Sequence, residues 1–441
     1  MDHDQAPGEV PHPRFRAVIN AVAPNAARSR GRILVVGGGI TGLSAAVEAA
    51  EAGCEVVLVE REPHLGGRVV QMYQYFPKLC PPVCGLEINL RRLRTNPRIK
   101  CFTCAQVQDV SEEHDQVRVH IRQSPRFVSE CCSGCGTCAE VCPVERKGTF
   151  DFGLKTGRAA YLAYPGAWPP GYTIDPASCA GASCGKCVAA CPCQAIDLSM
   201  PVRSFTFDVA AVIWATGWAP YPPERLTDLG FGSHRDIITN MMMERLASPH
   251  GPTQGRVLRP SNGSAPSSVA FVQCAGSRDD AHLGYCSGLC CMASAKQVRY
   301  LRNQHPEAEI TVYYIDRRAL GRHEGFMAET ERDAKVHYVP GKVAKIAIES
   351  DAPVLEVEDT SKCTRLRHRV DLVVLATGMV SSTSLDGLAL DNHGFLAREQ
   401  PSPGQFPAGC TRAPMDVASS VRDASSAVLR ALACCSNAGG K

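Results

Sequence analysis

Apolar and polar residues follow two different periods along the chain, and the first clear pattern begins at Arg32. Residues 33–36 are four consecutive apolar residues, as expected of a buried strand, and a glycine-rich turn follows them. A helix over about 40–52 and a strand over 56–60 complete the pattern. Together these segments predict a parallel strand–helix–strand unit of ordinary length.

A second strand–helix–strand pattern lies in the other half of the chain. It predicts a strand over 268–277, a helix over 293–304 and a strand over 309–316. Two further strands, at 207–217 and 370–378, each end in an Ala-Thr-Gly turn. Alternating strands and helices predict an α/β fold built on a doubly wound parallel sheet.

Length and charge narrow the class of protein. The 441 residues include 47 basic and 44 acidic side chains, and the net charge of +3 gives no support for nucleic-acid binding. The longest apolar stretches, such as residues 372–380, are far shorter than the ~20 residues that span a bilayer. We therefore expect a cytoplasmic protein without a signal peptide or transmembrane helix, which reaches a membrane only through partners.

The sequence Gly37-x-Gly39-x-x-Gly42 lies between the first strand and the first helix, and Glu60 ends the next strand. This context makes the glycine pattern a dinucleotide-binding fingerprint. Gly37 permits a tight turn, Gly39 leaves room for a pyrophosphate, and Gly42 lets the helix pack closely on the strand. Glu60 can accept hydrogen bonds from ribose hydroxyls. The alternative is a glycine turn that binds nothing.

The 23 cysteines are the unusual feature of the composition, because most of them lie in three tight groups. Disulfide frameworks are typical of short secreted chains, so clustered cysteines in a long chain indicate metal sites. Two groups are spaced C-x2-C-x2-C-x3-C and C-x4-C-x2-C-x3-C, each followed by Pro. The first spacing is that of bacterial ferredoxins, in which the fourth cysteine binds the other cluster.

This crossing rule assigns the cysteines to two [4Fe–4S] clusters. The first cluster is expected on Cys132, Cys135, Cys138 and Cys191, and the second on Cys142, Cys179, Cys184 and Cys187. The x4 step departs from the symmetric pattern, and a pair of zinc sites is the alternative. Cys131 and Cys193 are expected to be spare thiols.

The third group consists of Cys274, near the end of the strand expected over 268–277, and of Cys286, Cys290 and Cys291, which follow it. A nicotinamide-dependent flavoenzyme would have its second glycine fingerprint here, and this chain has none, so a nicotinamide site is not expected. No general rule covers the spacing of these four cysteines. A cluster and unliganded buried thiols both remain open from the chemistry alone.

Several short motifs resemble those of flavoproteins with two dinucleotide-binding domains, the class that includes thioredoxin reductase. They are the Gly66-Gly67-Arg68 element and the two turns ending in Thr216-Gly217 and Thr377-Gly378. The resemblance favours FAD over NAD and implies cofactor contacts from these residues and from Arg61, which follows Glu60. Asp416 resembles the acidic residue that holds the flavin's ribityl end, although a helix N-cap would be equally natural.

The stretch 274–297 resembles the family of heterodisulfide reductase A subunits, in which the matching cysteines bind a [4Fe–4S] cluster beside the flavin. The resemblance implies that Lys296 lies near flavin N5, where a cation stabilises the reduced, anionic flavin. The alternative is a solvated helix lysine. Residues 76–92, 182–187, 238–246 and 413–424 also resemble the A subunit of the quinone-interacting membrane-bound oxidoreductase complex, a close relative.

This second resemblance implies an electron-transfer enzyme subunit between adenylylsulfate (APS) reductase and the quinone pool in dissimilatory sulfur metabolism. Its partners would be APS reductase, a flavin and iron–sulfur B subunit, and the quinone-reactive membrane C subunit. The alternative is a soluble heterodisulfide-reductase-like A subunit that acts in electron bifurcation or sulfur oxidation. Cys80 and Cys84 follow the Gly-Gly-Arg element, and both a redox or ligand role and a structural role remain open for them.

These expectations combine into a domain organisation. A two-dinucleotide-binding-domain, thioredoxin-reductase-like flavoprotein would carry an inserted ferredoxin-like domain with two clusters. The expected parts are a flexible tail (1–30), an FAD-binding domain (31–125, 201–260 and 365–435), the ferredoxin-like insert (126–200) and a second nucleotide-binding-like domain with a cysteine cluster (261–364).

Overall fold

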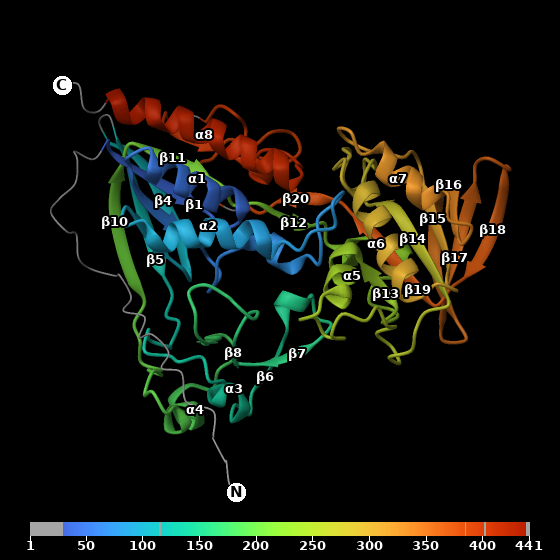
Figure 1. Cartoon of the computed structure of the whole chain (residues 1–441), viewed down its shortest axis with the longest axis horizontal. Helices are drawn as coiled ribbons and strands as arrows, with labels where there is room; N and C mark the ends of the chain where they lie inside the picture. The colour runs from blue at the N-terminus through green and yellow to red at the C-terminus, as the bar shows by residue number, and fades with distance from the viewer. Residues whose placement is uncertain (1–29, 114–115, 384, 401–402, 438–441) are drawn as a thin grey trace, which may run out of the picture.

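The computed structural model describes residues 30–113, 116–383, 385–400 and 403–437. The described residues form two α/β bodies side by side and a smaller cysteine-rich lobe below the first body (Figure 1). Apart from Arg30, the tail expected at 1–30 lies outside the described residues.

The first body is built on a five-stranded parallel sheet in the order β21-β11-β1-β2-β3. Alternate residues of its central strand face opposite layers. Ile33 and Val35 pack against helices, whereas Leu34 and Val36 pack against a small second sheet. The strands are β1 (Arg32–Val36), β2 (Glu55–Val59), β3 (Ile99–Phe102), β11 (Ala211–Trp214) and β21 (Gln405–Pro407), and the helices are α1 (Ile40–Glu51), α2 (Val83–Thr95) and α8 (Val417–Asn437).

The small second sheet is antiparallel, in the order β10-β5-β4, and consists of β4 (Ala105–Glu113), β5 (Gln116–Gln123) and β10 (Arg203–Val209). The single strand expected at 207–217 is wrong, because the chain changes sheets at Ala210. Val209 pairs with β5, whereas Ala211 pairs with Ile33 in the parallel sheet. A continuous apolar run has no periodic signal that could have marked this break.

The second body has a seven-stranded sheet in the order β13-β19-β14-β15-β16-β17-β18. Neighbouring strands are parallel from β13 to β16 and antiparallel from β16 to β18. Its strands are β13 (Ile237–Thr239), β14 (Ser268–Ala275), β15 (Glu309–Tyr314), β16 (Val336–Glu349), β17 (Ala352–Asp359), β18 (Thr364–Arg369) and β19 (Leu372–Thr377), and its helices are α5 (Asn240–Ala247), α6 (Cys290–Gln304) and α7 (Glu324–Glu331).

Each body therefore has its own sheet, entirely parallel in the first body and mixed in the second, where alternating strands and helices alone predict one doubly wound parallel sheet. The expected domain boundaries also differ from the observed pairing. β13 and β19 lie in the ranges 201–260 and 365–435 that are expected in the FAD-binding domain, but they hydrogen-bond within the second sheet. Two short antiparallel strands, β12 (Trp218–Pro220) and β20 (Met379–Ser381), connect the bodies. Pairing between distant segments is not visible in local sequence patterns.

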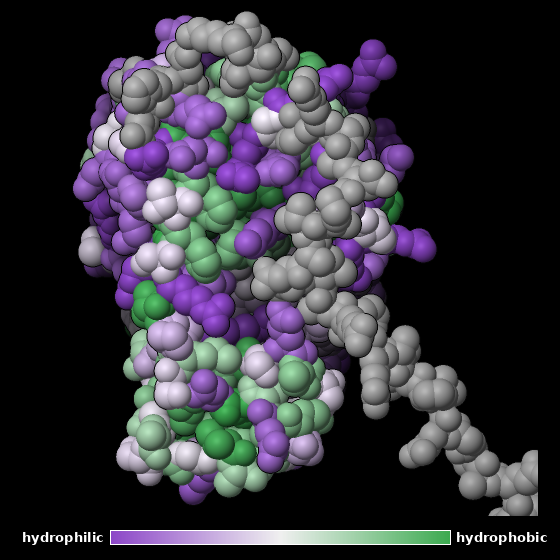
Figure 2. All heavy atoms as spheres, turned by 90° about the vertical axis from the view of Figure 1, so that its left-hand side faces the viewer, coloured by the Kyte–Doolittle hydropathy of each residue, from purple (hydrophilic) through white to green (hydrophobic). Residues whose placement is uncertain are grey.

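The cysteine-rich lobe has little regular structure. Its core combines Val128, Ala160, Ile174 and Ile196 with several cysteines. Seen from the side, the lobe projects below the first body and has a less polar surface than that body (Figure 2). Its elements are α3 (Thr137–Glu140), α4 (Lys186–Ala190), β6 (Glu145–Lys147), β7 (Thr156–Arg158), β8 (Ala160–Tyr161) and β9 (Thr173–Ile174).

Short 3-10 helices connect several of these elements. They are η1 (Gly67–Gln71), η2 (Thr149–Asp151), η3 (Gly181–Ser183), η4 (Pro223–Arg225), η5 (Thr227–Leu229) and η6 (Gly409–Thr411). Among the described helices, none is both long and apolar enough to cross a membrane.

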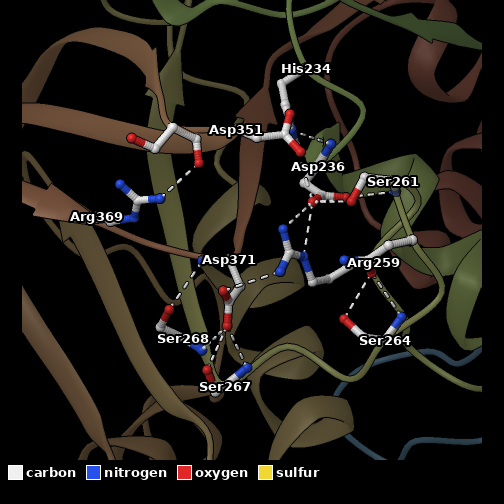
Figure 3. A network of polar contacts seen from close by, with 12 residues as sticks. His234, Asp236, Arg259, Ser261, Ser264, Ser267, Ser268, Asp351, Arg369 and Asp371 are labelled. Atoms are coloured by element: carbon white, nitrogen blue, oxygen red, sulfur yellow. Dashed lines mark hydrogen bonds and ion pairs between the residues drawn. The ribbon is translucent and has the colours of Figure 1, made fainter.

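A polar network fixes the segment 261–268 to the amino ends of the second body's strands (Figure 3). The buried carboxylate of Asp236, directly before β13, accepts hydrogen bonds from Arg259 Nε at 2.9 Å and Ser261 Oγ at 2.6 Å. Asp371, directly before β19, accepts from Ser267 Oγ at 2.6 Å. The network stabilises the edge of the sheet opposite the carboxyl ends, where ligands bind in α/β folds.

Candidate cofactor site

A cavity of about 720 Å³ lies at the carboxyl ends of the strands. Its walls come from both bodies: the glycine turn after β1, the start of α8, and the first two turns of α6. A cavity at this edge of the sheets is where the fold class binds dinucleotides.

The three glycines of the fingerprint have different surroundings. Gly37 has φ +109°, and a Cβ atom there would lie 2.2 Å from Ala215 O, so it permits both the turn and the close approach to β11. A Cβ at Gly42 would lie 1.8 Å from Gly37 O, so Gly42 permits the close packing of α1. A Cβ at Gly39 would meet only Gly67 Cα, at 3.7 Å, and the residue lines the cavity.

Glu60 ends β2 as expected, and its carboxylate is buried at the cavity wall. Its Oε2 atom accepts a hydrogen bond from Gly38 N at 2.6 Å, and Oε1 accepts one from Glu62 N at 2.8 Å. Burial raises the pKa of Glu60, and the two backbone donors partly oppose that rise. Arg61 also lines the cavity but is exposed, with Nε 3.7 Å from Glu62 Oε1.

The Gly-Gly-Arg element lies against the glycine fingerprint. Gly66 N donates to Gly38 O at 2.8 Å, and a Cβ at Gly67 would lie 2.8 Å from Gly39 Cα, so the two turns touch. Arg68 extends across the cavity wall, where Nε donates to Trp218 O at 3.1 Å. Burial lowers the pKa of the Arg68 guanidinium.

The first Ala-Thr-Gly turn and the last helix close another part of the cavity. Thr216 Oγ1 lies 2.6 Å from Thr383 Oγ1, and Gly217 N donates to Thr411 Oγ1 at 3.0 Å. Asp416 Oδ1 accepts a hydrogen bond from Ser419 N at 2.6 Å and caps α8. Asp416 thus has the N-cap role offered as the alternative, and it also lines the cavity.

Two buried hydroxyl groups of the described chain have no hydrogen-bond partner and belong to residues that line this cavity. They are Tyr75 OH and Ser382 Oγ. Buried polar groups are nearly always satisfied, so unpartnered ones in a cavity indicate a polar ligand. Together with Glu60 and the glycine fingerprint at 37–42 (the glycine cradle), these hydroxyl groups fit a bound dinucleotide.

Lys296 lies on α6 and is almost completely buried at the cavity, so it is not a solvated helix lysine. Its Nζ atom donates to Gln74 O at 2.7 Å and forms an ion pair with Glu244 Oε1 at 2.9 Å. The buried Glu244 also accepts from Gln297 Nε2 at 2.7 Å and from Tyr73 N at 3.0 Å. A buried cation with a buried counter-ion is thereby held beside the cavity.

Sequence reasoning did not identify Glu244. The available signal was a single acidic residue after three consecutive methionines in the segment Asn-Met-Met-Met-Glu-Arg-Leu, at 240–246. A carboxylate inside an apolar helix is rarely buried without a partner. That partner, Lys296, lies on another helix, and no spacing rule connects the two residues.

The third cysteine group gathers at the start of α6, next to the same cavity. Cys290 lines the cavity, and its thiol donates to Thr377 O at 3.7 Å. Cys291 donates to Asp316 O at 3.8 Å. Burial raises the pKa of Cys274 to about 11, and the neighbouring Cys291 and Cys286 reinforce that rise. The second Ala-Thr-Gly turn packs tightly here, since a Cβ at Gly378 would lie 2.6 Å from Ser277 Oγ.

The cysteines of the lobe surround two small cavities. Cys132, Cys135, Cys138 and Cys191 line one of them, together with Cys193. Cys142, Cys179, Cys184 and Cys187 line the other. These are the groupings that the crossing rule assigns to the two clusters. Across the described ranges, no three Cys, His, Asp or Glu side chains come close enough to hold a single metal ion.

Cys80 and Cys84 are exposed and do not line the cavity. The backbone beside them is tied to the site, because Tyr75 N donates to Cys80 O at 2.9 Å and Gln74 O contacts Lys296.

Comparisons with known proteins agree with this site and fold. The family of FAD dependent oxidoreductases matches residues 32–87, which contain the glycine fingerprint and the Gly-Gly-Arg element. Solved thioredoxin reductases from T. acidophilum and Lactococcus lactis cover 91% and 92% of this chain and 98% and 99% of their own, with a TM-score of 0.51 each and 13% and 11% identity. The chain therefore has a thioredoxin-reductase-like α/β fold, and its first strand–helix–strand unit matches the FAD dependent oxidoreductases.

The chain is also similar in sequence to A subunits of heterodisulfide reductases. The A subunit of the ferredoxin:CoB-CoM heterodisulfide reductase of Methanosarcina mazei is 37% identical over 93% of this chain and 54% of its own length. An iron-sulfur A subunit of the heterodisulfide reductase of Methanopyrus kandleri is 36% identical (91% and 64%). The A subunit of the H(2):CoB-CoM heterodisulfide,ferredoxin reductase of Methanothermobacter marburgensis is 33% identical (91% and 63%). The chain thus spans between about half and two thirds of the length of these relatives.

These findings confirm the resemblance to heterodisulfide reductase A subunits. FAD is confirmed by the matching family, and the name of the Methanopyrus relative agrees with iron–sulfur clusters as further cofactors. The names of these three relatives refer to heterodisulfide reductases and not to a quinone-interacting complex.

Proposed function

We propose that the chain is a heterodisulfide-reductase-like A subunit that transfers electrons between FAD and three [4Fe–4S] clusters. The observation that carries the proposal is the meeting of Lys296, Cys290 and the glycine cradle at one cavity. Bound there, FAD would supply the exchange between two-electron and one-electron steps, because each cluster carries one electron.

The glycine turn and the start of α8 would bind the FAD. Gly39 would leave the backbone N–H groups of the turn open to the pyrophosphate. Glu60 would accept hydrogen bonds from ribose hydroxyls. These bonds would either replace those from Gly38 N and Glu62 N or be added to them. Asp416 would orient the ribityl end while it continues to cap α8.

Lys296 and Glu244 would set the charge at the part of the cavity that lies next to Cys290. The ammonium group is held by Gln74 O at 2.7 Å and by Glu244 at 2.9 Å, so its position is fixed before any ligand binds. A buried cation favours the extra negative charge of a reduced ligand, and Glu244 limits the cost of burying that cation. Such preorganised charge needs no rearrangement when electrons arrive.

Twelve cysteines would hold the clusters. The two cavities in the lobe supply four each, and Cys274, Cys286, Cys290 and Cys291 supply the third set. The absence of a glycine fingerprint after β14 supports a cluster there in place of a nicotinamide, because a pyrophosphate would have no close backbone approach.

The comparisons favour the heterodisulfide-reductase-like alternative over the quinone-interacting complex as the setting of this chemistry. The Methanosarcina and Methanothermobacter relatives have ferredoxin in their names, so we propose that partner subunits and a one-electron carrier exchange electrons with this chain. A role between APS reductase and the quinone pool has no support in these comparisons. Any peripheral contact with the membrane would then depend on partner subunits.

Anaerobic purification followed by iron, sulfide and flavin analysis tests this function. The expected result is one FAD and about twelve iron atoms per chain, with flavin bands over a broad iron–sulfur absorption. Recovery of zinc in place of iron, or of FAD with fewer than eight iron atoms in freshly reconstituted protein, would contradict the proposal. Wild-type protein reconstituted without sulfide is the matched control, because it can bind adventitious iron but cannot form clusters.

A further inference from the structure

A pair of thiols lies outside the cofactor site, between the first and last helices of the first body. Cys54 Sγ and Cys435 Sγ are 3.9 Å apart, and the two residues are 0% and 3% exposed. Cys54 lies in the short connection between α1 and β2, and Cys435 lies in the last turn of α8. Neither belongs to the three cysteine groups that the proposed function uses.

We propose that Cys54 and Cys435 form a reversible disulfide that ties together the far ends of the two helices that begin at the FAD cavity. The bond would be a modification site that controls how firmly FAD is held.

The placement of the two helices connects the proposed disulfide with FAD binding. Ile40, the first residue of α1, and Val417, the first residue of α8, both line the cavity. The helices pack along one another, with a hydrogen bond from Ser425 Oγ to Glu48 Oε1 at 3.0 Å near their middle. Both therefore run from the FAD cavity to the thiol pair, and a bond at the far ends restricts their separation at the near ends.

The electrostatic surroundings favour Cys54 as the attacking thiol. The hydrogen bond between the two thiols lowers the pKa of Cys54 below its ordinary value, although burial opposes this, and the cations Arg30 and Arg98 add to the effect. The pKa of Cys435 is raised, chiefly by its hydrogen bond with Cys54 and by burial. A thiol of lowered pKa next to a second thiol is the arrangement of redox-sensitive cysteine pairs.

The oxidant is hydrogen peroxide, and the steps balance. The Cys54 thiolate attacks one peroxide oxygen, the O–O bond breaks, and the products are a sulfenic acid and hydroxide, which takes up a proton to become water. The Cys435 thiol then attacks the sulfenic sulfur and loses its proton, so that an S–S bond forms and a second water leaves. Two thiols have lost two electrons in total, and the peroxide has gained them.

The geometry allows this closure without rebuilding the core. The sulfurs must approach from 3.9 Å to about 2.05 Å. Cys435 is two residues from Asn437, where α8 ends, and the last turn of a helix frays most easily. Fraying also admits a small oxidant to two thiols that are buried in the closed structure. The neighbouring thiol of Cys434 instead donates to Arg430 O of its own helix at 3.7 Å.

The test treats anaerobic holoprotein with substoichiometric hydrogen peroxide, blocks free thiols, and maps disulfides by mass spectrometry. The expected product is a Cys54–Cys435 peptide that dithiothreitol removes. Oxidised protein should release FAD on dilution at least threefold more slowly than reduced protein, and its melting temperature should rise by about 5 °C.

Cys434→Ser and Cys435→Ser are the matched pair of variants, because both receive the same oxidant exposure and only the second removes a member of the proposed pair. Cys434→Ser should behave as wild type, whereas Cys435→Ser should lose the linked peptide and the slower FAD release. A Cys54 that is found unlinked, overoxidised or bonded to Cys434 in the wild-type protein would overturn the proposal. So would equal FAD release from the two oxidised variants.

Discussion

Replacing Gly39 by valine should remove FAD while leaving the fold in place. Gly39 has φ −74° and ψ −174°, an extended conformation that a branched residue adopts without strain. Its added Cβ would meet only Gly67 Cα, at the ordinary contact distance of 3.7 Å. The new side chain would instead occupy the part of the cavity where the pyrophosphate approaches the backbone.

The expected change in stability is much smaller than the expected loss of FAD affinity. The free energy of unfolding should change by less than about 1 kcal/mol, because no atom is displaced and a glycine replacement restricts the unfolded chain. FAD should lose at least two hydrogen bonds between backbone N–H groups and charged phosphate, each contributing about 1.5–3 kcal/mol. The dissociation constant for FAD should therefore rise about 10²- to 10⁴-fold.

The assay combines FAD content and affinity with the urea unfolding of flavin-free protein. Gly85→Val is the matched control, because nothing lies within 4 Å of its added Cβ and Gly85 is exposed on α2. Gly42→Ala should instead destabilise the fold itself, because its Cβ would lie 1.8 Å from Gly37 O. Full FAD occupancy in Gly39→Val, or unfolding as severe as in Gly42→Ala, would refute the reasoning.

Three further predictions follow from the site. Cys135→Ser and Cys187→Ser should each remove roughly four iron atoms and leave FAD bound, as measured by iron and flavin analysis. Glu244→Gln should lower the free energy of unfolding, measured by urea titration, by about 3–5 kcal/mol, because it leaves Lys296 as an unpaired buried cation. Replacing Lys296 by methionine in the same chain should restore part of that loss. Glu60→Gln should gain stability relative to wild-type apoprotein as pH rises above about 4.3, because the raised pKa of Glu60 makes its ionisation destabilising in the folded state.

Controls make these outcomes specific. Cys131→Ser, next to the first cysteine set but outside its cavity, should retain all iron. Glu87→Gln breaks the exposed ion pair with Arg94 at 3.3 Å and should change stability by less than about 1 kcal/mol. A cluster count unchanged in Cys135→Ser, a Glu244→Gln as stable as wild type, or a pH-independent difference for Glu60→Gln would each contradict the corresponding assignment.

The parts of the fold that could be predicted are those with strong local signals. The helix expected at about 40–52 is observed as Ile40–Glu51, because a glycine turn marks its start and an apolar pattern marks its length. The helix expected at 293–304 begins three residues earlier, at Cys290, so two cysteines expected before the helix form its first turn. Cysteines at a helix start have no distinctive local pattern, and helix ends are the least certain feature.

The features that escaped prediction are contacts between distant residues. The thiols of Cys54 and Cys435 are separated by 381 positions and meet only because α8 packs along α1. Glu244 and Lys296 come from different helices of the second body. The assignment of β19 to the second sheet depends on its hydrogen bonds with β13 and β14. Tertiary packing decides such pairings, and local sequence carries little information about them.

The central claim is that electrons move between FAD and the clusters and do not come from a nicotinamide. Stopped-flow reduction of the anaerobic holoprotein tests it most directly, with absorption followed separately at the flavin and cluster bands. A low-potential one-electron donor should reduce clusters and flavin together, NADH and NADPH should bleach neither at a useful rate, and Cys290→Ser should separate the two signals. Rapid bleaching of the flavin by NADH or NADPH, with the clusters following, would contradict the account.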